Sequence, residues 1–200
     1  WSSDVCSSDL AGGPGTRLGE LTRSKPKPLL PVGDRPILDH VLERLEQAGI
    51  HTIYVSVHYL AEQIETFIAE RDNAGTVQVL HETERMGTAG ALSQMPEAAR
   101  GEVLVVNADI MTKANFSAIE SFPHRQGHDA TIAVANYEVQ VPYGVVRHTE
   151  DGIFQGIDEK PRQMFLAAAG IYLLSPQFTA LVPPDRAMDM PELLNLGRSI

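Results

Sequence analysis

Residues 12–18 read GGPGTRL, and residues 26–28 read PKP. Glycine has no Cβ, so this backbone can approach a bulky anion closely and point its N–H groups at phosphate oxygens. Arg17 adds a planar guanidinium suited to phosphate, and Lys27 adds an ammonium between two prolines that restrict the chain. The segment therefore predicts a polyphosphate-binding loop, which in an α/β fold follows a buried strand.

Two better-known phosphate loops are excluded. The chain contains no Gly-Lys-Ser/Thr, which a P-loop requires. A dinucleotide fingerprint requires G-x-G-x-x-G, and Leu18 stands where the third glycine would follow Gly13 and Gly15. The remaining alternative is an ordinary glycine-rich turn, because glycine is common in turns of every kind. Arg17 and the PKP segment favour phosphate binding over that alternative.

Helix and strand patterns alternate along the chain, which predicts an α/β fold with a mostly parallel sheet and helices on both faces. Apolar residues recur at helical spacing over 36–49, and residues 103–106 are wholly apolar, as expected of a central strand. With no repeat or linker, we expect one compact domain. The predicted strands are 52–57, 76–80, 103–106, 130–135, 144–147, 153–157 and 168–174, and the predicted helices are 36–49, 60–71, 88–94 and 177–181.

The first ten residues, WSSDVCSSDL, do not fit the apolar strand expected before the glycine-rich loop. Burying Asp9 there without a partner would be costly. We interpret residues 1–10 as a non-native, adapter-derived segment, with a real but polar N-terminal strand as the alternative. Residues 11–200 then form the domain proper.

The composition of the chain indicates which kinds of partner and which cell compartment to expect. The net charge of −10 argues against a nucleic-acid-binding surface, which is normally basic. No apolar run is long enough to span a membrane, and Cys6 is the only cysteine, so the sequence predicts a cytoplasmic protein without an internal disulfide. The seven histidines are scattered and predict no zinc site. The sequence leaves the oligomeric state open.

Residues 10–18, 21–22 and 25–32, taken in order, resemble the sugar-phosphate nucleotidyltransferase family. Its members join a nucleoside triphosphate to a sugar 1-phosphate and release pyrophosphate. The resemblance implies a three-layer Rossmann-like nucleotidyltransferase fold with a mostly parallel, mixed central sheet. It also implies that residues 11–200 are a nucleotidyltransferase catalytic domain truncated at both ends, because the family continues with another strand and helix beyond residue 200. The pattern is closest to members of the mannose-1-phosphate guanylyltransferase type and to those associated with CBS-type regulatory domains.

Asp109 follows the predicted central strand, within the run Asn107-Ala108-Asp109. Ligands of open α/β sheets bind beyond the carboxyl ends of strands, where a carboxylate can hold Mg²⁺ against phosphate oxygens. The resemblance assigns Asp109 this metal-binding role; the alternative is a loop or helix-capping residue. The family has a second metal-binding aspartate on a later strand, but neither Asp185 nor Asp189 matches its context. One carboxylate with retained waters would hold Mg²⁺ more weakly.

Residues 82–92 read ETERMGTAGAL and resemble the family's E-x-x-x-L-G-T-A-G-A-L segment. A carboxylate at Glu82 can accept from both the N1–H and N2–H₂ groups of guanine, which favours GTP over UTP or dTTP. The alternative is that Glu82 caps a turn or faces solvent. The resemblance implies a nucleotide-binding set of Gly12, Gly13, Gly15, Thr16, Arg17, Glu82, Gly87 and Thr88.

The later half of the chain carries the predicted sugar-binding residues. Tyr143 and Gly144 resemble the family's sugar-pocket segment, and Glu159 and Lys160 resemble its E-K-P element. The resemblance implies that Glu159 accepts from sugar hydroxyls and Lys160 binds the sugar phosphate. Ala168 departs from the pattern, because many relatives have a sugar-contacting asparagine there.

The implied catalytic residues are Arg17, Lys27 and Asp109, with NTP and sugar 1-phosphate as substrates. An anionic phosphate oxygen is already a nucleophile near neutral pH, so positioning and charge neutralisation suffice. Two alternatives stay open. One is a thymidylyl- or uridylyltransferase acting on a hexose or amino-sugar 1-phosphate; the other is a non-catalytic nucleotide-sensing module of the same fold.

Overall fold

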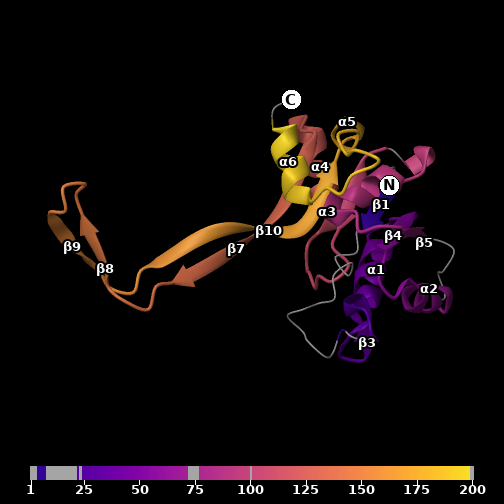
Figure 1. The fold of residues 1–200 in the computed structure, drawn as a ribbon, viewed down its shortest axis with the longest axis horizontal. Coiled ribbons are helices and arrows are strands. Elements are labelled where there is room, and N and C mark those ends of the chain that lie inside the picture. Colours follow the sequence, from indigo (N-terminus) through magenta and orange to yellow (C-terminus); the bar gives the residue numbers. More distant parts are fainter. Residues whose placement is uncertain (1–3, 8–21, 23, 72–76, 100, 199–200) are drawn as a thin grey trace. The chain divides into compact units, whose positions relative to one another are not determined.

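The central feature of the computed structural model is a six-stranded sheet with the order β5-β4-β1-β6-β10-β7. Figure 1 labels β1, β4, β5, β7 and β10. The model describes residues 4–7, 22, 24–71, 77–99 and 101–198. Strands β1, β4, β5 and β6 are parallel, whereas β10 runs antiparallel to β6. The predicted mostly parallel, mixed sheet is confirmed. The strands are β1 (Asp4–Ser7), β4 (Ile53–Val57), β5 (Val77–His81), β6 (Val103–Val106), β7 (Ala130–Gln140) and β10 (Arg162–Leu174).

The helices and the minor strands complete the fold. The α-helices are α1 (Ile37–Gln47), α2 (Ala61–Ala69), α3 (Gly87–Gly90), α4 (Phe116–Gln126), α5 (Pro176–Thr179) and α6 (Met190–Gly197). The 3₁₀ helices are η3 (Lys27–Leu29), η5 (Ala91–Gln94) and η6 (Glu97–Ala99). Two small antiparallel pairs join β2 (Pro31–Val32) to β3 (Arg35–Pro36) and β8 (Val145–His148) to β9 (Phe154–Asp158).

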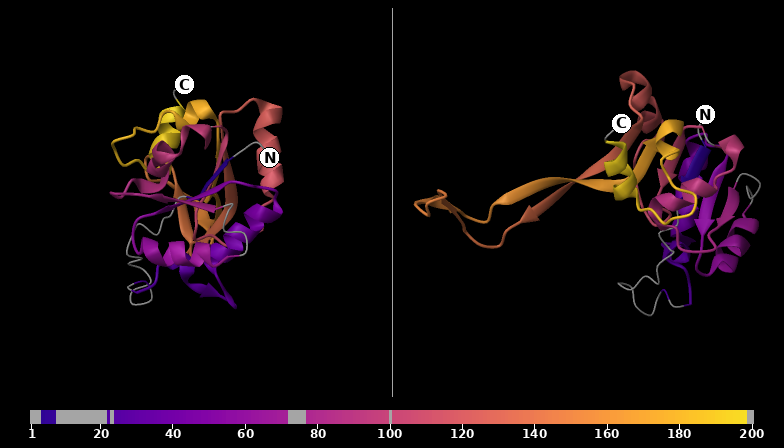
Figure 2. Two further views of the ribbon diagram at one scale, coloured as in Figure 1. Left: turned by 90° about the vertical axis from the view of Figure 1, so that its right-hand side faces the viewer. Right: turned by 45° about the horizontal axis from the view of Figure 1, so that its top comes forward.

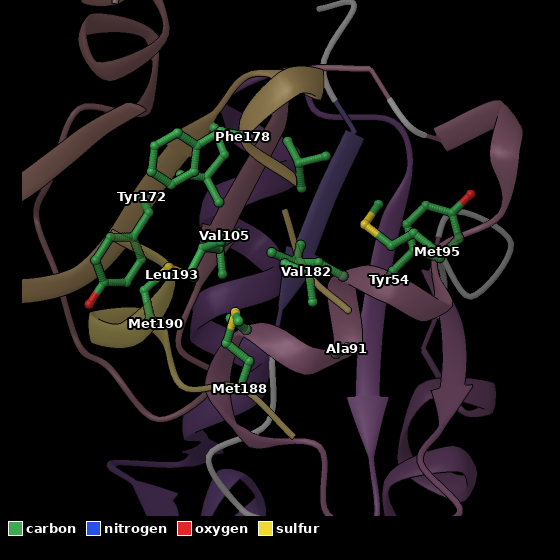
Figure 3. Close-up of a cluster of buried hydrophobic side chains, with 14 of the residues drawn as sticks. Tyr54, Ala91, Met95, Val105, Tyr172, Phe178, Val182, Met188, Met190 and Leu193 are labelled. Carbon is green, nitrogen blue, oxygen red and sulfur yellow. The ribbon is translucent and has the colours of Figure 1, made fainter. Parts of the chain in front are cut away.

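The sheet carries packed side chains on both faces because alternate residues of a strand point in opposite directions. On one face, Val105 pairs with Tyr172 and belongs to a buried cluster that includes residues of α3, α5 and α6 (Figure 3). On the other face, Val106 lines a small cavity with Val41 of α1 and Phe116 of α4. This arrangement confirms the three-layer α/β architecture.

The chain divides into two compact units, where the sequence predicts one compact domain. The first unit comprises residues 1–131 and 170–200, and the second comprises residues 132–169. The second unit is a ribbon built from parts of β7 and β10, followed by the β8–β9 hairpin (Figure 2). Its surface has exposed apolar side chains, such as Phe154 and Leu166, and the ion pairs Arg147–Asp158 and Arg162–Glu138.

Two α-helices lie where the sequence patterns predict none. Helix α4 contains Pro123, which interrupts the helical pattern, so periodicity alone does not predict it. Helix α6 corrects the expectation that only 177–181 is helical in the later part of the chain. A local signal for α6 does exist, because an aspartate, a proline and a glutamate at 189, 191 and 192 are typical of a helix start.

Strand β1 differs from the expectation for the N-terminal residues. Asp4–Ser7 forms a strand that pairs in parallel with both β4 and β6. This arrangement corresponds to the polar N-terminal strand considered as an alternative. Pairing does not test whether residues 1–10 are native, and residues 8–10 lie outside the described part of the chain.

No helix among the described residues is both long enough and apolar enough to cross a lipid bilayer.

Candidate active site

The candidate site begins at the carboxyl ends of β1 and β6. In the sheet, β4 lies beside β1 and β5 lies beside β4, so on this side the chain moves away from β1. The next parallel strand, β6, lies on the opposite side of β1. The strand order therefore reverses between β1 and β6, which makes this position the switch point of the sheet. Ligands of open α/β sheets bind at such a switch point. Residues 107–109 directly follow β6 at this end. The predicted loop residues Gly12, Gly13, Gly15, Thr16 and Arg17 lie outside the described residues.

Lys27 and Asp109 are in direct contact. The Lys27 Nζ atom donates to Asp109 Oδ2, although the two residues are separated by 82 positions. The Lys27 side chain is 37% exposed and that of Asp109 is 14% exposed. Lys27 belongs to η3, whose Pro28 and Leu29 are buried and hold the segment in place. The fold thus brings a cation and a carboxylate from two separate sequence motifs to one point.

Asn107 lies beside the same strand end and is held against β10. Its backbone N–H donates to the Gly170 carbonyl oxygen at 2.9 Å. Gly170 has a φ of +72°, and a Cβ at this position would lie 2.4 Å from Asn107 Nδ2. Only glycine combines this backbone conformation with this close approach. The backbone of Asn107, a residue that the sequence analysis did not assign, is thereby held against Gly170 of β10.

The Glu82 carboxylate is 9% exposed and has partners within the protein. Its Oε1 atom accepts from the Ser56 hydroxyl of β4, and its Oε2 atom accepts from the Met86 N–H at 2.9 Å. The Glu82 backbone carbonyl is also 2.9 Å from His58 Nδ1. These contacts match the turn-capping alternative for Glu82. Each oxygen has a further lone pair, so the guanine-binding hypothesis stays a prediction.

Gly87 and Thr88 form a turn that packs against residues 188–190. The Thr88 N–H donates to Asp189 Oδ1 at 3.0 Å, and the Met190 N–H donates to the Thr88 hydroxyl at 2.7 Å. Gly87 has a φ of +78°, and a Cβ there would lie 2.6 Å from the Met188 carbonyl oxygen. In this structure the polar groups of Thr88 therefore bind the protein itself. The sequence analysis left Asp189 unassigned.

The four predicted sugar-binding residues all lie in the second unit. A Cβ at Gly144 would lie 2.8 Å from Ile157 Cγ2 and 3.1 Å from Glu159 Oε2, so the structure brings Gly144 and Glu159 together. Lys160 has a φ of +48°, a left-handed conformation that is uncommon outside glycine. Tyr143 is 74% exposed. Their binding roles stay predictions.

Asp109 is the candidate metal-binding residue. No group of three or more His, Cys, Asp or Glu residues that could hold a metal ion occurs within the described ranges. Mg²⁺ in nucleotide sites often binds only one or two carboxylates and completes its shell with phosphate oxygens and water. Asp109 therefore fits a Mg²⁺ site in which the phosphate oxygens of a nucleotide and water molecules supply the other ligands.

A doubly wound sheet with charged side chains at its switch point defines an α/β protein of the Rossmann-like class. Within this class the chain belongs to the nucleotidyl transferase family, because the model of that family matches residues 10–190.

Two relatives support this assignment. The catalytic subunit beta of mannose-1-phosphate guanylyltransferase from Drosophila pseudoobscura pseudoobscura is 38% identical over 174 residues, which cover 84% of this chain and 47% of that protein. Mannose-1-phosphate guanyltransferase beta-A from Xenopus laevis is 35% identical over 176 residues, with coverages of 84% and 49%. The chain spans about half the length of these curated relatives.

A solved structure has the same fold. HddC from Yersinia pseudotuberculosis, complexed with GMP-PN, matches with a TM-score of 0.70 and 27% sequence identity. The match covers 98% of this chain and 86% of that chain. The predicted Rossmann-like nucleotidyltransferase fold is thereby confirmed.

Proposed function

We propose that the protein transfers a nucleotidyl group from a nucleoside triphosphate to a sugar 1-phosphate, giving an NDP-sugar and pyrophosphate. The observation that carries this proposal is the contact between Lys27 and Asp109 beside the switch point of the sheet. This contact joins a cation and a carboxylate from two motifs that are 82 positions apart in the sequence. Family membership supports the same reaction class.

In the proposed reaction, an anionic oxygen of the sugar 1-phosphate attacks the α-phosphorus of the triphosphate. A new P–O bond forms, the bond from the α-phosphorus to the bridging oxygen breaks, and pyrophosphate leaves with that electron pair. Lys27 neutralises charge on the α-phosphate, and Arg17 with the amides of residues 12–16 binds the leaving pyrophosphate. Asp109 would hold Mg²⁺, which supplies further charge neutralisation when bound.

The ion pair gives each of its two side chains a partner of opposite charge. Lys27 neutralises the largely buried carboxylate of Asp109. A nucleotide with its metal would offer each group a stronger partner: phosphate oxygens for Lys27 and a divalent cation for Asp109. The two side chains then exchange one partner for another, so neither charge is left unpaired.

We infer that GTP is the preferred nucleotide and that a hexose 1-phosphate is the acceptor. The names of the relatives from Drosophila and Xenopus, and the GMP-PN complex of the Yersinia protein, support guanine. For the sugar phosphate, we keep the assignment to Gly144, Glu159 and Lys160, and the proximity of Gly144 to Glu159 supports it.

The test is product formation with each nucleotide in turn. The protein is incubated with Mg²⁺ and mannose 1-phosphate, and pyrophosphate release is measured with GTP, ATP, CTP, UTP and dTTP. We expect GTP to give a kcat/KM at least about tenfold above any other nucleotide, the ratio that a difference of one or two hydrogen bonds produces. Glucose 1-phosphate is the matched control acceptor.

Two results would reject parts of this proposal. Faster turnover with UTP or dTTP would support the thymidylyl- or uridylyltransferase alternative. Nucleotide binding without pyrophosphate release, for every acceptor tried, would support the nucleotide-sensing alternative and exclude catalysis.

A further inference from the structure

We propose that Asp189 is a positioning residue that holds the nucleotide-binding turn in shape, and that residues 188–190 act as a clamp on residues 86–89. This inference rests on the proposed function, since it assigns the clamp to the nucleotide side of that site. It adds a residue that the resemblance did not assign and that lies 101 positions from its partner Thr88.

The clamp consists of hydrogen bonds that alternate between the two segments. The Met188 N–H donates to the Met86 carbonyl at 2.8 Å, and the Ala89 N–H donates to the Met188 carbonyl at 2.9 Å. Asp189 Oδ1 accepts from the Thr88 N–H at 3.0 Å and has a longer contact of 3.4 Å with the Thr88 hydroxyl. The same hydroxyl accepts from the Met190 N–H at 2.7 Å. Backbone and side-chain bonds thus fix the turn from both sides.

The side chain of Asp189 does not cap its own helix. It occupies the N-cap position of α6, where an aspartate normally accepts from the backbone N–H of the first turn. Its side chain makes no such bond, and its carboxylate binds Thr88 instead. The side chain is therefore directed at the turn, although a capping role at its own helix would be the common one.

The close approach of residues 188 and 189 requires a glycine at position 87. Its φ of +78° suits glycine, and a Cβ there would lie 2.6 Å from the Met188 carbonyl and 2.9 Å from Asp189 Oδ1. The glycine thus serves two purposes: it allows the turn, and it leaves room for residues 188 and 189. The sequence analysis assigned Gly87 to the nucleotide-binding set and did not predict its contact with residues 188 and 189.

The side chains on either side of Asp189 anchor the clamp in the core. Met188 and Met190 are each 2% exposed and belong to the cluster that also contains Val105, Ala91 and Leu193 (Figure 3). Asp189, between the two methionines, is exposed and turned to Thr88. Met188 and Met190 thus anchor the segment in the core. Asp189, which lies between them, directs its carboxylate toward Thr88.

The test compares two substitutions of Asp189. Asp189→Ala removes the acceptor for Thr88, whereas Asp189→Asn keeps an acceptor oxygen. We expect Asp189→Ala to raise the KM for GTP about tenfold, with kcat and the KM for the sugar phosphate changed less than about threefold. Asp189→Asn is expected to stay within about threefold of the parent in all three constants, because its amide oxygen still accepts.

Amide hydrogen exchange gives a readout that does not depend on catalysis. In Asp189→Ala we expect the Thr88 and Ala89 amides to exchange about tenfold faster, while the β6 amides keep their protection. Asp185→Ala, an exposed carboxylate in the same connection, is the matched control and is expected to change neither readout. Should Asp189→Ala fail to fold, Thr88→Val removes the hydroxyl that contacts Asp189 Oδ1 and accepts from the Met190 N–H, at nearly constant volume, and faster exchange of the Met190 amide is then expected.

The outcomes separate the two proposals. Unchanged exchange at Thr88 overturns the clamp, whether or not the protein is an enzyme. Faster exchange with an unchanged KM for GTP overturns the positioning role and leaves a purely structural contact. An Asn variant as impaired as the Ala variant also overturns the inference, because charge and not hydrogen bonding would then matter. A parent protein without activity rejects the proposed function, while the exchange experiment still tests the clamp.

Discussion

Replacing Lys27 by alanine is expected to lower kcat by about a thousandfold while the fold remains intact, the scale seen when one charge-stabilising donor is removed from a transition state. Lys27 is the one cation among the described residues that contacts Asp109 through its side chain. Its loss leaves negative charge on the α-phosphate without that partner. Pyrophosphate release under saturating substrates measures the effect.

The control for this variant lies two residues away. Lys25 is an exposed lysine of the same segment, and Lys25→Ala is expected to keep kcat within about twofold, as surface substitutions usually do. Thermal unfolding of both variants checks that the fold is retained. A Lys27→Ala enzyme with a kcat near that of the parent would remove Lys27 from the catalytic set.

Replacing Asp109 by asparagine is expected to lower kcat/KM by about a hundredfold to a thousandfold, or about 2.7–4 kcal/mol of transition-state stabilisation. Asparagine keeps the size of the side chain and one oxygen but loses the charge that attracts Mg²⁺. We expect the variant to need a higher Mg²⁺ concentration than the parent to reach half of its maximal activity. Activity measured across a Mg²⁺ titration tests this directly.

Asp34→Asn is the matched control, because Asp34 is an exposed aspartate between β2 and β3. Its Mg²⁺ dependence is expected to equal that of the parent. If Asp109→Asn and the parent show the same Mg²⁺ dependence, Asp109 does not hold the metal.

Much of the fold follows from local patterns. The stripe Leu38, Leu42 and Leu45 predicts α1, and these side chains are fully buried. The apolar run 103–106 predicts a central strand, and β6 is buried along its whole length. Both predictions succeed because the periodicity of burial is visible in neighbouring residues.

Contacts between distant segments leave no such pattern. The bond between Thr88 and Asp189 joins residues 101 positions apart, and no spacing rule predicts it. Strand β10 continues from buried residues 170–174 into exposed residues 162–168, so the predicted strand 168–174 captures only its buried end. The division into two units was not predicted for a similar reason. The strands of the second unit are mostly exposed, so their sequences lack the alternation of buried and exposed residues that marks a sheet packed on a core.

The candidate site was predictable in part. Family motifs identified Lys27 and Asp109, and the structure brings the two together. Ser56 and Asn107 were not predicted, because their roles depend on Glu82 and Gly170 approaching them in space. A small polar residue at a strand end has many possible partners, and sequence alone does not choose among them.

The most direct test of the central claim is a crystal structure of the protein with Mg²⁺ and a non-hydrolysable GTP analogue. The account predicts Lys27 Nζ within hydrogen-bonding distance of an α-phosphate oxygen, Asp109 bound to the metal, and the amides of residues 12–17 on the β- and γ-phosphates. A triphosphate bound away from Lys27 and Asp109 would contradict it.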